Sequence, residues 1–112
     1  RNTILGFRNI NEGHLLENVV YLELLRRGYK VSIGKSNEYE VDFIAETPNE
    51  IIYYQVSLSI QDEKVKEREL RSLESIKDNY EKIILTMDKT MNKDYNSIKV
   101  INLIEWLLLD KI

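Results

Sequence analysis

The sequence predicts a single α/β domain with a mixed central sheet flanked by helices. An apolar helical pattern occupies the first quarter of the chain, and three strand-like segments separated by turn residues follow it. A polar helix then connects the third of these segments to another short, apolar strand. With 112 residues, 43% of them apolar and 31% charged, the chain can form one core under a solvated surface.

The first helix is predicted to begin at Asn11 as its N-cap and to end before Gly28, where a C-terminal glycine is expected. Two arginines in its last turn suit the helix dipole. Apolar residues surround most of its circumference, so we expect this helix to be largely buried.

Three strands are predicted at residues 29–34, 40–46 and 51–58, and the turns between them at 35–38 and 47–50. Such short connections predict an antiparallel meander. The third segment is apolar or aromatic on both faces near its start, which is typical of a central strand covered on both sides.

A second helix is predicted from the capping-box spacing of Ser59 and Asp62 to about Asn79. Its narrow apolar stripe consists of Val65, Leu73, Ile76 and Tyr80. The buried strand at 82–87 should then lie parallel to the strand at 51–58, because a helix connects the two. A polar loop (88–97), a strand (98–102) and a helix (103–110) complete the order α-β-β-β-α-β-β-α.

Composition excludes several classes of function. The net charge of −3 and the pI near 5.2 argue against a protein that holds nucleic acid by bulk positive charge. The absence of cysteine excludes disulfides, thiolate zinc sites and cysteine nucleophiles, and His14 is the only histidine. No glycine-rich phosphate loop is present, and the longest apolar run, 106–109, is too short for a membrane span. We therefore expect a cytoplasmic protein without membrane contact.

Three polar residues on two predicted strands form the candidate site. Asp42 lies on the second strand, and Gln55 and Ser57 share one face of its hairpin partner. A carboxylate beside two further oxygen-bearing side chains is the arrangement that holds a hard divalent cation such as Mg²⁺. The alternative is that these residues form the solvated face of the sheet.

Glu17 lies on the predicted first helix beside Tyr21 and Leu24, away from the other charged residues of that helix. A carboxylate on a buried helix face needs a partner. That partner is either a cation or metal, or a hydrogen bond from a backbone or tyrosine group.

Several short runs, taken together, resemble a known family. They are Leu15-Leu16-Glu17-Asn18, Arg27-Gly28-Tyr29, Glu40-Val41-Asp42-Phe43-Ile44 and Asp78-Asn79-Tyr80-x-Lys82. In order and spacing they resemble the C-terminal domain of unknown function carried by many prokaryotic AAA-type ATPases. With the positions of Glu17, Asp42 and Gln55, the element order is similar to the PD-(D/E)XK, or restriction-endonuclease-like, nuclease fold.

The resemblance implies a domain organisation. The chain opens on Arg1 and not on methionine, so we expect a fragment of a longer protein. Residues 1–10 would be an N-terminal extension from an upstream domain, and residues 11–112 a single nuclease-like C-terminal domain. The upstream ATPase domain would be its partner, and ATP would bind only there.

The resemblance also implies residue roles. Glu17, Asp42 and Gln55 fit the positions that hold Mg²⁺ in the nuclease fold, but Ser57 stands where a lysine activates water. A hydroxyl has no positive charge for that task, and Gln55 is a neutral ligand. The four residues are therefore expected to form a degenerate catalytic set. Lys64 and Lys66 on the next helix either supply a displaced cation or solvate that helix.

Two further residues are auxiliary candidates. His14 either pairs with Glu17 or has a capping or packing role. Glu69, inside the apolar stripe of the second helix, either pairs with a basic side chain or reaches the same cleft.

Three functions remain open at this point. The first is an accessory domain of an ATPase that serves recognition, regulation or assembly. The second is an active Mg²⁺-dependent nuclease on DNA or RNA. The third is a protein-interaction or dimerisation domain, which would make a homo-oligomer.

Overall fold

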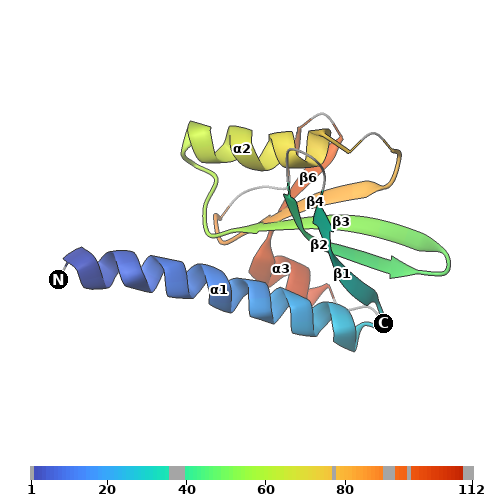
Figure 1. The fold of residues 1–112 in the computed structure, drawn as a ribbon, viewed down its shortest axis with the longest axis horizontal. Helices are drawn as coiled ribbons and strands as arrows, with labels where there is room; N and C mark the ends of the chain where they lie inside the picture. Colours follow the sequence, from blue (N-terminus) through green and yellow to red (C-terminus); the bar gives the residue numbers. More distant parts are fainter. Residues whose placement is uncertain (1, 36–39, 77, 90–92, 96, 110–112) are drawn as a thin grey trace.

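The computed structural model describes residues 2–35, 40–76, 78–89, 93–95 and 97–109 (Figure 1). The described residues form three helices and six strands. The helices are α1 (Asn2–Arg26), α2 (Glu63–Glu74) and α3 (Leu103–Leu108). The strands are β1 (Lys30–Lys35), β2 (Glu40–Thr47), β3 (Glu50–Ser57), β4 (Glu81–Thr86), β5 (Lys93–Tyr95) and β6 (Ile98–Asn102).

The strands form one mixed sheet in the order β1-β2-β3-β4-β6-β5. The first three strands pair antiparallel as a meander, and β3, β4 and β6 run parallel. The predicted meander and the parallel crossover from β3 to β4 are confirmed. The short edge strand β5, antiparallel to β6, lies in the stretch predicted as a polar loop.

The helices cover both faces of the sheet (Figure 1). One buried cluster joins α1 and α3 to the sheet, and Val20, Leu24, Tyr54, Leu85 and Trp106 belong to it. On the other face, α2 packs through Leu73 on a cluster with Val41, Ile84, Ile98 and Val100. The centre of the sheet is thus buried on both sides, as the apolar third segment predicted.

Helix α1 is longer than predicted at its N-terminal end. It runs unbroken through Asn11, so the prediction of an N-cap at that residue is wrong: a local capping preference did not stop a continuing helix. The predicted C-terminus is confirmed. Gly28 has a φ of +93°, its N–H donates to the Leu25 carbonyl, and the Tyr29 N–H donates to the Leu24 carbonyl.

The expectation that α1 is largely buried is also wrong. Val20 and Leu24 are fully buried, but Leu15 and Leu22 are 61% and 63% exposed. The helix rests on the sheet with one face only. Among the residues that the structure describes, no helix is long and apolar enough to cross a membrane.

Helix α2 begins and ends inside its predicted bounds. Asp62 is the N-cap, and its carboxylate accepts the N–H groups of Lys64 and Val65. Ser59 instead accepts the N–H of Gln61 in the preceding turn, so its predicted capping role is wrong. The helix stops at Glu74, well before the predicted end near Asn79.

The pairing of β1 with β2 is interrupted by a bulge. Gly34 pairs with Val41 and Ser32 with Ile44, so two residues of β2, one of them Asp42, oppose a single residue of β1. A Cβ on Gly34 would lie 2.8 Å from Cδ1 of Ile44 and 3.2 Å from Cβ of Val41. An added Cβ would therefore force the Ile44 side chain to shift, and glycine avoids this clash at the bulge.

The bulge changes which side chains share a face. Val41 packs on the α2 side, whereas Phe43 and Ala45 pack on the α1 side. Strict alternation along a strand would place these three residues on one face, but it does not hold across a bulge.

Candidate functional site

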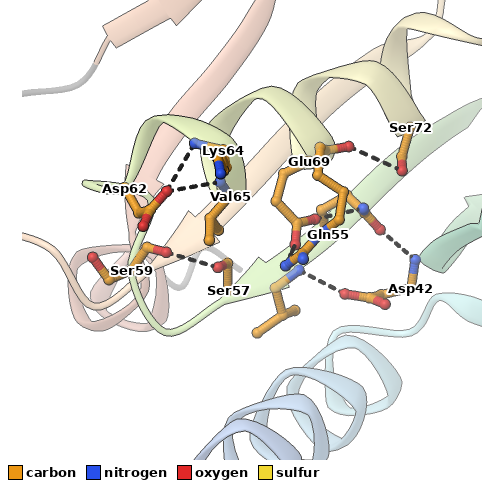
Figure 2. Close-up of polar contacts among 11 residues, drawn as sticks. Asp42, Gln55, Ser57, Ser59, Asp62, Lys64, Val65, Glu69 and Ser72 are labelled. Atoms are coloured by element: carbon orange, nitrogen blue, oxygen red, sulfur yellow. Dashed lines mark hydrogen bonds and ion pairs between the residues drawn. The ribbon is translucent and has the colours of Figure 1, made fainter.

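Asp42, Gln55 and Glu69 are joined by hydrogen bonds between β2, β3 and α2 (Figure 2). The backbone N–H of Asp42 donates to Oε1 of Gln55 at 2.6 Å, and Nε2 of Gln55 donates to Oε1 of Glu69 at 2.7 Å. Oδ2 of Asp42 accepts the N–H of Val56 at 2.9 Å. We call Asp42, Gln55 and Glu69 the polar cluster.

The end of the regular β2–β3 pairing explains why side chains make these bonds. Regular pairing of β2 with β3 begins at Phe43 and Tyr54, one position beyond Asp42. At that point the N–H groups of Asp42 and Val56 bond to side chains instead of to the opposite strand. The polar cluster thereby provides hydrogen-bond acceptors for two backbone N–H groups that have no partner in the β2–β3 ladder.

The polar cluster is largely shielded from water. Gln55 is only 4% exposed, and both ends of its amide have partners. Burial, and secondly the charge of Asp42, raise the pKa of Glu69, although Arg68 and the bond from Gln55 counteract part of this rise. Two carboxylates therefore approach each other here, with a neutral amide between them.

Ser57 and Lys66 have partners outside the polar cluster. The Ser57 hydroxyl donates to the carbonyl of Ser59 at 3.0 Å (Figure 2). Lys64 is exposed in the first turn of α2. Nζ of Lys66 lies 3.3 Å from Glu63 and 5.1 Å from the ring centre of Tyr95. These contacts support the interpretation that Lys66 solvates and packs α2.

Glu17 and His14 belong to α1, which covers the sheet face opposite to α2 (Figure 1). Glu17 is half-buried and His14 is exposed. Glu69 was predicted either to pair with a basic side chain or to reach the candidate site, and its carboxylate bonds to Gln55 of that site. Its contact with a basic side chain, Arg68 at 3.7 Å, is with the adjacent residue of the same helix. The convergence of Glu17 with Asp42, Gln55 and Ser57 stays a prediction.

The structure also bears on metal binding. Within the described ranges, no three histidine, aspartate or glutamate side chains gather closely enough to hold a metal ion. Asp42 and Glu69, with the amide oxygen of Gln55, are the oxygen donors that the polar cluster offers. These residue types suit Mg²⁺, but the amide oxygen already accepts a backbone N–H.

A second polar network ties the start of β4 to β3. Lys82, 8% exposed, donates to Oδ1 of Asp78 at 3.1 Å and to the carbonyls of Asp78 and Tyr80, both at 3.0 Å. All three ammonium hydrogens are thus used. The Tyr53 hydroxyl donates to Oδ2 of Asp78, and burial together with this bond raises the pKa of Tyr53 to about 12.

The sequence analysis did not predict the hydrogen bonds of this network. The available signal was a lysine at the start of an otherwise apolar strand. The network borders a cavity of about 370 Å³ whose lining includes Leu73, Asp78, Tyr80 and Lys82. It also explains why α2 ends early, since Asp78 and Tyr80 hold the connecting loop on Lys82.

Residues 12–106 match the family described as a domain of unknown function, DUF4143. The chain belongs to this family. The DUF4143 match includes the polar cluster and the network around Lys82. An uncharacterized protein of Haemophilus influenzae is 41% identical over 108 residues, which are 96% of this chain and 26% of that relative. The DUF4143 chain thus spans about a quarter of the curated relative's length, and no solved structure matches it significantly.

Proposed function

We propose that this DUF4143 domain is a non-catalytic accessory domain of a longer protein, with a restriction-endonuclease-like fold and a degenerate nuclease site. In this proposal an AAA-type ATPase domain precedes it in the same chain, and the domain serves recognition, regulation or assembly. The length of the relative, about four times that of this chain, supports an accessory role. The order α-β-β-β-α-β of the first six elements supports the proposed fold.

The observation that carries the proposal is that the polar groups of the cluster already form hydrogen bonds within the protein. An oxygen that binds Mg²⁺ must direct a lone pair at the ion, and one of the two lone pairs on Oε1 of Gln55 already accepts the Asp42 N–H. The amide nitrogen of Gln55 is bonded to Glu69. Turning the amide toward a metal would leave a buried N–H without its partner, at a cost of about 1–3 kcal/mol.

The group that would activate water is also missing. Ser57 donates to Ser59 and has no charge to stabilise a developing negative charge on phosphate. Losing one such preorganised stabiliser typically costs on the order of 3 kcal/mol, which is roughly a hundredfold in rate. The net charge of −3 offers no general attraction to a polyanion that would offset this loss.

An active Mg²⁺-dependent nuclease is the second candidate, and one observation favours it. Asp42 and Glu69 approach the same amide from two different elements, and the negative charge of Asp42 raises the pKa of Glu69. Mg²⁺ sites commonly use one or two carboxylates beside substrate phosphates. Asp42 and Glu69 would then hold the ion.

A cleavage assay separates the two candidates. Wild type, Asp42→Ala and Ser57→Lys are incubated with single- and double-stranded DNA and RNA in Mg²⁺ or Mn²⁺, with Glu67→Ala as an exposed-carboxylate control on α2. The proposal predicts no metal-dependent cleavage by the wild type. Wild-type cleavage that persists in Glu67→Ala and disappears in Asp42→Ala would contradict it. Activity in Ser57→Lys alone would identify the lost group.

The ATPase context needs a separate measurement. ATP hydrolysis is compared between the longer protein and the same protein without residues 1–112. The proposal predicts hydrolysis in both, with a rate or a partner dependence that changes when the domain is removed. A longer protein that neither contains a Walker A motif nor hydrolyses ATP would contradict this part.

A further inference from the structure

The exposed apolar side chains gather on one layer of the molecule. Of the nine large apolar side chains exposed among the described residues, seven lie on α1, on α3 or at the end of α3. They are Leu15, Tyr21, Leu22, Leu25, Ile104, Leu108 and Leu109. We call them the α1/α3 surface, because both helices cover the same face of the sheet. Such clustering is typical of an interaction surface.

The exposed part of α1 carries no ionic group over more than three turns. Among the α1 side chains that the structure describes, the exposed ones before Arg26 include no acid, lysine or arginine. They are His14, Leu15, Asn18, Tyr21, Leu22 and Leu25. Glu23 is largely covered and is bonded by Arg26 and Arg27. In a chain with 31% charged residues, a solvated helix face would carry charges.

The spacing within this face is that of helix-on-helix packing. Leu15 and Leu22 are seven residues apart, and so are Asn18 and Leu25. Together the four residues occupy successive a and d positions of a heptad repeat. A polar residue among such positions fixes the register of the pairing at some cost in stability, a role that Asn18 would fill.

We propose that a second copy of this chain packs on the α1/α3 surface through a two-fold axis, with the two α1 helices antiparallel. A two-fold interface places the same patch on both sides, so it must be complementary to itself. The exposed face of α1 from His14 to Leu25 meets this condition, since it carries no acid, lysine or arginine that would bring like charges together. On α3, the exposed Glu105 lies between the apolar Ile104 and Leu108. With the axis between Asn18 and Leu22, Leu15 packs against the partner's Leu25.

The size of the surface also fits a second copy. The exposed fractions of the seven side chains correspond to roughly 700 Å², close to the roughly 800 Å² that each partner contributes to a standard interface. The N-terminal turns of α1 reach beyond the sheet (Figure 1). This inference is independent of the proposed function, because it involves none of the residues of the polar cluster.

Sedimentation equilibrium of the 112-residue chain over micromolar to submillimolar concentrations tests the proposal. The wild type is expected to form a dimer, and Leu22→Lys to weaken it at least tenfold, because each dimer then contains two unpaired charges. Asn18→Leu is expected to tighten it several-fold. The matched control is Ile33→Lys, since Ile33 is 69% exposed on β1, outside the surface, and this variant should dimerise like the wild type.

A wild type that stays monomeric throughout this range would overturn the proposal, as would equal weakening by Ile33→Lys. Should Leu22→Lys fail to fold, Leu108→Lys at the 78% exposed position on α3 replaces it. The chain has no cysteine, so Leu22→Cys can be labelled selectively. Slow labelling in a longer, monomeric protein would assign the surface to another part of that protein and would likewise overturn the proposal.

Discussion

Asp42 and Gln55 are joined by a hydrogen bond from backbone to side chain: the N–H of Asp42 donates to Oε1 of Gln55 at 2.6 Å. The carboxylate of Asp42 accepts the N–H of the next residue, Val56. One residue of β2 is thus held by two consecutive residues of β3, next to the end of the regular β2–β3 pairing and at the bulge between β1 and β2. Residues that the sequence indicates as metal ligands therefore stabilise the strand pairing.

Gln55→Leu tests this structural role. The variant keeps most of the side-chain volume but leaves the Asp42 N–H and the Glu69 carboxylate without a buried partner. We expect the free energy of unfolding to fall by about 2–3 kcal/mol, measured by chemical denaturation. Gln61→Leu at an exposed position is the control. A loss in Gln55→Leu no larger than in this control would show that the bonds contribute little.

Glu69→Gln predicts a change in the pH dependence of stability. Burial and the charge of Asp42 raise the pKa of Glu69 above its ordinary 4.5, so its ionisation opposes folding. The stability that the protonated group provides is complete below 4.5 and is lost as the pH rises through the folded pKa. Relative to the variant, the wild type should therefore lose stability as the pH rises from below 4.5 toward 7.

Chemical denaturation at a series of pH values measures this difference. The exposed Glu67→Gln on the same helix should follow the wild type at every pH. A wild type that gains stability relative to Glu69→Gln as the pH rises would reverse the sign and contradict the assignment.

Gly34→Ala and Gly13→Ala should change stability in opposite directions. At Gly34 a methyl group would lie 2.8 Å from Cδ1 of Ile44, so we expect a loss of about 1–2 kcal/mol. At Gly13, inside α1, nothing lies within 4 Å of the added carbon, so alanine should stabilise by up to about 1 kcal/mol. Thermal unfolding measures both. Ile44→Val removes the obstructing atom and should recover part of the Gly34→Ala loss.

Arg27→Ala should be far more costly than Arg26→Ala. Arg27 donates to the Trp106 carbonyl at 2.8 Å and its guanidinium lies 4.5 Å from the ring centre, which ties α1 to α3. We expect its loss to cost about 2 kcal/mol. Arg26 is exposed and pairs with Glu23 on its own helix, so its loss should cost less than about 1 kcal/mol. Similar losses in denaturant melts of the two variants would contradict this assignment.

Periodicity and turn residues predicted the order of the elements, apart from β5. The three-residue strand lacks an apolar pattern because it is an edge paired with β6 only. Gly28 indicated the end of α1 correctly, because a positive φ after a helix favours glycine. The start of α1 was mispredicted, since Asn11 can either cap a helix or continue one.

The candidate site was predicted in part, for reasons of the same kind. Asp42 and Gln55 were expected to meet, because they lie on adjacent strands of a hairpin. The bulge could not be predicted from alternation, so the exchange of backbone partners was not foreseen. Burial of α1 was overestimated because the sequence pattern of an apolar helix face is the same whether that face packs on the sheet of its own domain or on another surface.

The central claim is that the polar cluster holds the strands together and not a metal ion. The most direct measurement is the free energy of unfolding of the wild type and of Asp42→Ala as Mg²⁺ or Mn²⁺ is added. A site occupied at a hundred times its Kd would stabilise the folded chain by about 2.7 kcal/mol. We predict that millimolar metal changes the stability of the wild type by less than about 0.3 kcal/mol. A rise of about 1.4 kcal/mol or more that is absent in Asp42→Ala would contradict this account.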